Sequence, residues 1–139
     1  MKTLLLATAI RLLLPIFFLF SLYMFFRGHD LPGGGFIAAL VLTIGVLFHL
    51  LALGKDKTLR LFGMSTYWLI ALGLAAMSIA ALAGIFQGDA LLEAYWLDVN
   101  IPLIGKLGTP ILFDAGVYLV VVGVSLTIAF ALFEDESWK

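Results

Sequence analysis

The 139-residue chain has no cysteine and few charged side chains. Without cysteine it can form no disulfide, no thiolate nucleophile and no cysteine-ligated metal site. Charged residues make up 12% of the chain, whereas soluble domains carry about 25%. The formal net charge of -1 provides no basic surface of the kind that binds nucleic acid. Apolar residues dominate instead, at 63% of the chain.

This apolar content is too high to be buried inside one small soluble domain. The mean hydropathy is +1.15, and a chain of this length has a limited interior. A lipid bilayer accepts apolar side chains without requiring an interior, provided that the backbone is hydrogen-bonded internally. We therefore predict an all-α membrane protein, with residues 1–139 forming a single membrane domain.

Four apolar stretches approach the length of about 20 residues that a helix needs to cross a bilayer. The second and third contain no Asp, Glu, Lys or Arg, and the fourth contains one carboxylate, Asp114. Arg11 interrupts the first stretch, so we expect that helix to begin before Arg11. The same interruption argues against a cleaved signal peptide, which needs an apolar core of its own. The predicted spans cover about residues 4–26, 33–54, 66–86 and 111–133.

The distribution of Lys and Arg predicts the orientation, because cytoplasmic loops are rich in these residues. Most basic residues fall on the side that holds both termini, so we predict that both termini are cytoplasmic. That side has Lys2, Arg11, Lys55, Lys57, Arg60 and Lys139, and the other side has Arg27 and Lys106.

Two predicted spans carry stripes of small residues, which let helix backbones approach closely in lipid. The stripes do not identify the neighbouring helix. Because so little of the chain lies outside the membrane, we expect them to pack against partner chains. The second span has Ala38, Gly45 and Ala52, and the third has Gly73, Ala76, Ala80 and Gly84.

The two longer loops differ in character. Residues 87–110 mix acidic, aromatic and aliphatic residues, and we expect an interfacial segment that lies against the bundle or a neighbour. The loop before the second span has one proline, which restricts the backbone, followed by three glycines, which free it. We favour a tight turn between two helices for this loop. The alternatives are a hinge, a close contact with a partner helix, and a backbone that approaches an ion. The candidate residues of the loop are His29, Pro32, Gly33, Gly34, Gly35 and Phe36.

Asp114 is a functional candidate because ionisable residues inside lipid are costly. On a helix it shares a face with Tyr118 and Ser125, and these side chains could form a polar track. A structural role is the alternative. Thr109 and Pro110 are typical of a helix start, where the helix dipole stabilises an acid. The residues alone leave both roles open.

Two other ionisable side chains lie within the apolar stretches. His49 could relay protons, because imidazole changes charge near neutral pH. We favour an interhelical hydrogen bond for it, which is the commoner use of such a histidine. For Arg11 we expect the side chain to extend toward the headgroups, and pairing with an acid on a neighbouring subunit is the alternative.

The sequence offers no catalytic or metal-binding pattern. It has two histidines, and neither has a helix-spaced carboxylate beside it as a metal site would require. No serine has a histidine and an acid at a recognisable spacing. We therefore expect no enzymatic activity, no metal site and no cofactor.

Two motifs resemble a known family. Residues 11–36, which read RLLLPIFFLFSLYMFFRGHDLPGGGF, are similar to the opening of the MnhB/MrpB family of Mrp-type antiporter subunits. GTPILFDAGVYLVVVG, in the fourth span, resembles the TPLLFD-x-GVYLVV-x-G pattern of that family. The chain departs from the family at Ala38 and Ala39, where glycines are frequent. The second motif carries Thr109, Pro110, Phe113, Asp114, Gly116, Val117 and Tyr118.

The resemblance implies an accessory subunit of a multisubunit complex that exchanges cytoplasmic Na⁺ for external protons. Its partners would be other Mrp subunits, and its location a prokaryotic cell membrane. The alternative is the homologous subunit of a hydrogenase-type or sulfur-reducing complex. A freestanding membrane scaffold is a third hypothesis, and the two motifs disfavour it. The resemblance leaves open whether Asp114 and the glycine turn serve ion movement or assembly.

Overall fold

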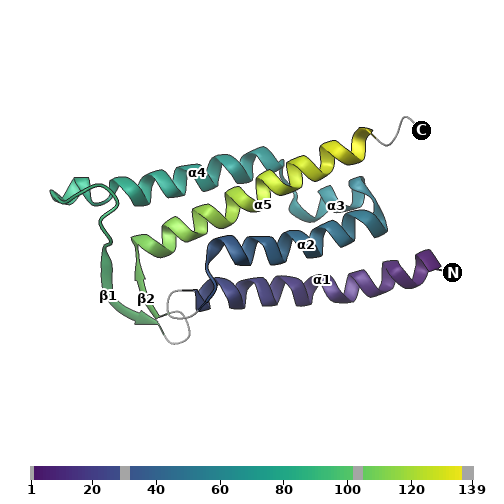
Figure 1. Cartoon of the computed structure of the whole chain (residues 1–139), viewed down its shortest axis with the longest axis horizontal. Helices are drawn as coiled ribbons and strands as arrows, with labels where there is room; N and C mark the ends of the chain where they lie inside the picture. The colour runs from purple at the N-terminus through teal and green to yellow at the C-terminus, as the bar shows by residue number, and fades with distance from the viewer. Residues whose placement is uncertain (1, 29–31, 102–104, 136–139) are drawn as a thin grey trace.

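The computed structural model describes residues 2–28, 32–101 and 105–135. Its main elements are four helices that run side by side (Figure 1). They have the length and apolar composition needed to cross a membrane, as the sequence predicts, if the short helix α3 is counted with α4. The long helices are α1 (Lys2–Arg27), α2 (Gly35–Leu53), α4 (Thr66–Leu82) and α5 (Thr109–Asp135).

The short helix α3 (Lys55–Phe62) lies at the end of the bundle that also holds both chain ends (Figure 1). The chain enters it through Gly54, whose φ of 88° favours glycine. Helix α3 exposes the charged residues Asp56, Lys57 and Arg60. It buries Thr58, so it attaches to the bundle by its uncharged face.

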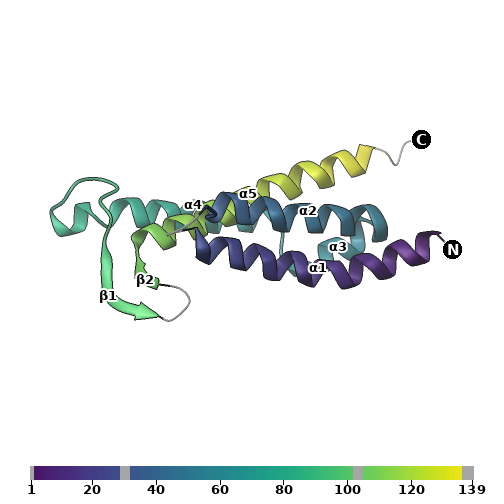
Figure 2. The same cartoon turned by 60° about the horizontal axis from the view of Figure 1, so that its bottom comes forward.

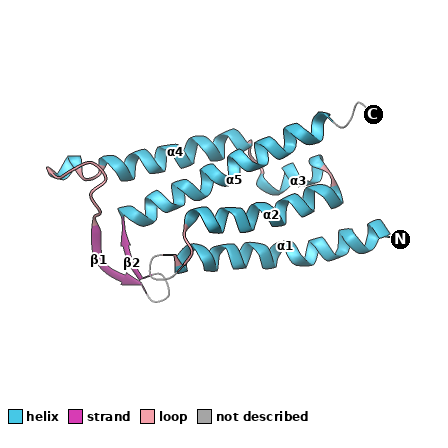
Figure 3. Ribbon diagram, in the orientation of Figure 1, coloured by secondary structure: helices cyan, strands magenta, loops and turns pink. Residues whose placement is uncertain are grey.

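The loop at the opposite end contains a β-hairpin that was not expected from the sequence. After a short 3₁₀ turn (Ile85–Gln87), β1 (Trp96–Ile101) pairs antiparallel with β2 (Gly105–Gly108). The hairpin extends from the ends of the helices in both views (Figures 1 and 2), and Figure 3 separates its strands from the helices. Thr109 joins it to α5: the Thr109 N–H donates to the Tyr95 carbonyl at 2.9 Å, and the Thr109 hydroxyl accepts from the Tyr95 N–H at 3.0 Å.

Gly45 and Gly73 pack inside the chain, so the expectation that they face partner chains is wrong for these two residues. A Cβ added to Gly73 would lie 2.6 Å from the Gly116 carbonyl oxygen of α5. A Cβ added to Gly45 would lie 2.6 Å from the Phe17 Cβ of α1. Helix pairs α4–α5 and α1–α2 use these positions to approach each other, because lipid offers no hydrophobic driving force and close packing must hold the helices together.

Candidate functional site

The ionisable side chain predicted in the fourth span lies where three helices meet. Here α2 begins next to the early turns of α5, and the end of α1 lies alongside. The Gly35 N–H, at the start of α2, donates to the Asp114 Oδ2 at 3.2 Å. One residue earlier, the Gly34 N–H donates to the Met24 carbonyl of α1 at 3.1 Å. We call the group Ser21, Gly34, Gly35, Asp114 and Tyr118 the polar junction.

The glycines of the junction are required by its geometry. Gly34 has a φ of +105°, which side chains rarely allow. Gly35 has no such angle but lies against the α5 backbone, since an added Cβ would be 2.1 Å from the Asp114 carbonyl oxygen. A Cβ on Gly33 would likewise lie 2.5 Å from the Met24 carbonyl oxygen. The turn therefore brings helix backbones into contact, and the contacts are within this chain.

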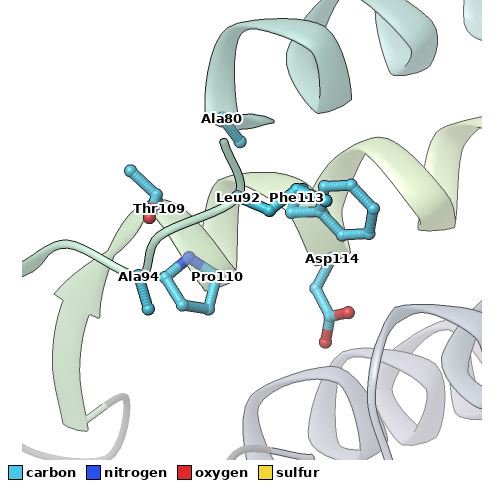
Figure 4. Close-up of a pocket in the computed structure, with 7 residues that line it drawn as sticks. All are labelled: Ala80, Leu92, Ala94, Thr109, Pro110, Phe113 and Asp114. Atoms are coloured by element: carbon cyan, nitrogen blue, oxygen red, sulfur yellow. The ribbon is translucent and has the colours of Figure 1, made fainter. Parts of the chain in front are cut away.

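Asp114 stabilises a different helix from the one that the sequence indicated. It lies beyond the first turn of α5, and the Thr109 hydroxyl is occupied by Tyr95. The carboxylate instead accepts an N–H at the start of α2, where the helix dipole favours negative charge. Figure 4 shows the carboxylate pointing away from Thr109 and Pro110, which line a cavity of about 280 Å³ beside it. Its direction matches the bond to α2.

Ser21 completes the junction; it lies within the stretch of residues 11–36 but is not among the predicted candidates. It is fully buried, and its hydroxyl donates to the Ala38 carbonyl at 2.7 Å. The Tyr118 hydroxyl oxygen lies 2.9 Å from the Ser21 hydroxyl oxygen. Because a serine hydroxyl has one hydrogen, Tyr118 must be the donor to Ser21. Tyr118 thus bonds to α1, and its ring packs edge-on against Phe25, with 5.8 Å between the ring centroids.

His49 lies at the other end of α2, about 14 residues or roughly 21 Å from Gly35. Its Nδ1 is 2.9 Å from the Thr58 hydroxyl, and that hydroxyl donates to the Gly54 carbonyl at 2.9 Å. With the hydroxyl hydrogen used, the His49 Nδ1 must carry the donated proton. The favoured interhelical hydrogen bond is therefore present, between α2 and α3. We call His49, Gly54 and Thr58 the elbow.

The remaining candidates lie apart from the junction and the elbow. Arg11 is exposed on α1, and Pro32 and Phe36 are exposed beside the turn. His29 lies outside the described residues. Within the described ranges, no three His, Asp or Glu side chains gather as a metal site would need.

Comparison with known proteins shows similarity along almost the whole chain. Residues 5–127 match a family described as a domain related to the MnhB subunit of Na⁺/H⁺ antiporter. The chain is 36% identical over 134 residues to the B subunit of the Na⁺/H⁺ antiporter of Alkalihalophilus pseudofirmus, covering 95% of this chain and 93% of that protein. It is 34% identical over 135 residues to the equally named protein of Bacillus subtilis, covering 96% and 94%.

A solved structure of the Mrp complex from Dietzia sp. DQ12-45-1b contains a similar fold. The TM-score is 0.82 and the sequence identity 33%, and the match covers 95% of this chain. This chain spans only 14% of the matched chain. The family match over residues 5–127 includes both the polar junction and the elbow.

Proposed function

The chain belongs to the MnhB family, and from this premise we propose that it is an accessory subunit of a multisubunit monovalent cation/proton antiporter. The observation that carries the proposal is the match over residues 5–127, with two relatives of similar length that are named as the B subunit of a Na⁺/H⁺ antiporter. The partners are the other subunits of an Mrp complex in a bacterial cell membrane. These names do not favour the alternative of a hydrogenase-type or sulfur-reducing complex.

In this proposal residues 1–139 act as one membrane unit with both termini in the cytoplasm. The arrangement of the bundle supports this orientation, because both termini and α3 lie at the same end (Figure 1). That end also has Lys55, Lys57 and Arg60, and cytoplasmic loops are rich in such residues. The hairpin end would then face the outside.

We propose that the ionisable side chains of the spans hold helices together and that the chain has no enzymatic activity of its own. Asp114 and His49 each bond within the chain, and roughly 21 Å of α2 separates their positions. Between them lies an apolar cluster that includes Leu42 and Val46. Thr43 is buried in the same stretch, and its hydroxyl bonds to neither group. A proton path needs a chain of polar groups, which this spacing does not supply.

A pull-down tests the subunit assignment. The tagged chain is purified from its native membranes in a mild detergent, and the copurifying proteins are identified by mass. Recovery of large antiporter subunits without redox proteins is the expected result. Hydrogenase or iron–sulfur subunits would move the chain to the alternative complex. Recovery of the chain alone, under conditions that preserve a known Mrp complex, would overturn both assignments.

Two substitutions of Asp114 separate assembly from ion movement. Asp114→Asn keeps an oxygen that accepts from Gly35 but removes the charge, whereas Asp114→Leu removes both. We expect Asn to retain complex yield and Na⁺/H⁺ exchange in membrane vesicles. Leu leaves a buried N–H unpaired, at a cost of about 1–3 kcal/mol, and should lower yield and exchange together. An Asn complex that assembles fully but exchanges no ions would show that the carboxylate serves transport.

A further inference from the structure

Arg11 is a charged side chain on the outer face of the bundle. Helix α1 packs chiefly on α2, to which the buried Ser21 is hydrogen-bonded. Arg11 itself is exposed, and in the part of the chain that the structure describes no hydrogen bond or ion pair holds it.

The residues before Arg11 place it inside the apolar layer. Leu4, Leu5 and Leu6 are 74%, 69% and 51% exposed. Consecutive helix positions point in different directions, so these leucines surround the helix. Raising Arg11 to the water would expose all three leucines to water as well. Arg11 is about nine residues, or roughly 14 Å, from the start of α1. The Arg11 backbone therefore lies within the apolar layer, below these leucines.

The backbone at Arg11 has a second unmet group. Pro15 lies inside α1 and has no N–H, so the Arg11 carbonyl lacks its usual donor four residues later. Pro15 is exposed, like Arg11, and one helical turn places the two on the same side. Helix α1 is visibly bent in Figure 2, as helices with an internal proline are. At one depth in the membrane, α1 thus presents both a cation and a carbonyl without its usual helical donor.

We propose that this face of α1 binds a transmembrane helix of another subunit, and that the partner helix carries an Asp or Glu side chain at the depth of Arg11. The inference rests on the proposed function, because it requires a complex. Charge complementarity identifies the occupant: a guanidinium within lipid is stabilised by a carboxylate with two parallel hydrogen bonds. A donor on the same partner helix would satisfy the Arg11 carbonyl. A lipid phosphate would satisfy the guanidinium alone, since lipid tails have no donors.

The test compares Arg11→Leu, Arg11→Lys and the unchanged chain, each tagged and expressed with the full set of complex subunits. Leucine inserts into lipid more readily than arginine, so the variant chain should reach the membrane at least as well. We expect Arg11→Leu to recover about tenfold less of the partner subunits, because it leaves the partner carboxylate unpaired. Arg11→Lys keeps the charge and should lie between. Arg60→Leu, which removes an exposed cation from α3, is the matched control and should change recovery less than twofold (roughly 0.4 kcal/mol).

The outcomes separate this inference from the proposed function. If the unchanged chain recovers no partner subunits, the proposed function fails. If it recovers them and Arg11→Leu recovers them equally, Arg11 binds lipid and the inference is wrong. If Arg11→Leu loses them, neutralising the matching acid in a span of the partner should restore recovery.

A second measurement applies if Arg11→Leu is degraded in the cell. A photo-crosslinking residue is introduced at Thr8, which is exposed on the same face of α1, one turn before Arg11. Crosslinking to another subunit of the complex supports the inference, and crosslinking to lipid alone contradicts it.

Discussion

The two ends of the bundle are held together by different means. At the polar junction, a carboxylate of α5 accepts a backbone N–H of α2 across 79 residues of sequence. At the elbow, an imidazole of α2 meets a hydroxyl of α3 only nine residues away. The junction also needs bare backbone at Gly35, whereas at the elbow an added Cβ on Gly54 would meet nothing within 4 Å. A contact between distant segments depends on close packing of the backbones as well as on hydrogen bonds. A local contact is held in place by the turn that connects its two residues.

The largest expected effect is at Gly35. In Gly35→Ala the new Cβ would meet the Asp114 carbonyl oxygen at 2.1 Å, and a backbone oxygen cannot rotate away. We expect a loss of roughly 3 kcal/mol or more in the free energy of unfolding, with a matching loss of complex yield. Thermal unfolding of the purified chain in detergent, followed by size-exclusion chromatography, measures it.

Gly63→Ala is the matched control at the elbow end. Gly63 has a φ of +59°, and an added Cβ there meets nothing within 4 Å. Only backbone strain of about 1 kcal/mol should appear. Equal losses for the two alanine variants would contradict the requirement for close contact at the junction.

A smaller effect separates the two hydroxyls of the junction. Ser21→Ala removes the acceptor of Tyr118 and the donor to Ala38, and should cost about 1–2 kcal/mol. Tyr118→Phe keeps the Ser21 bond to Ala38 and the ring contact with Phe25, and should cost about 0.5 kcal/mol. Unfolding both variants in mixed detergent micelles measures the difference in their free energies of unfolding. A larger loss for Tyr118→Phe would show that Tyr118 has a further partner.

A small effect, comparable to that of Tyr118→Phe, is expected at the elbow. Thr58→Val removes the acceptor of His49 but preserves the shape of the side chain, and should cost about 0.6 kcal/mol. Thr58→Ser keeps the hydroxyl and should be close to the unchanged chain. The same unfolding measurement applies. If Thr58→Val were as damaging as Gly35→Ala, the two ends would not differ as described.

The sequence predicts the spans well, because a long uncharged apolar run is costly in water and suits lipid. It also identifies Asp114 and His49, since an ionisable side chain inside such a run needs a partner. It does not identify those partners. The Asp114 bond ends on a backbone N–H, which every residue except proline has, so no residue type indicates it. The small residue Gly73 predicts close approach of a helix but not which one.

Two features carried a signal in the sequence that did not lead to a prediction. Ser21 is a hydroxyl within an apolar span, and such residues commonly bond between helices. In β1, the apolar Leu97 and Ile101 alternate with the polar Asp98 and Asn100, and alternation of period two indicates a strand. The prediction for residues 87–110 is an interfacial segment with no stated secondary structure, so this alternation is not used in it.

The separation of Gly35 from Asp114 in the chain also has a consequence for biosynthesis. The ribosome releases α1 and α2 into the membrane well before α5 exists. Until then the Gly35 N–H and the adjoining bare backbone have no acceptor from α5, in a solvent that supplies none. The arrival of α5 closes the bundle as the last step, so a nascent chain halted before residue 114 would leave this polar edge open to chaperones and membrane proteases.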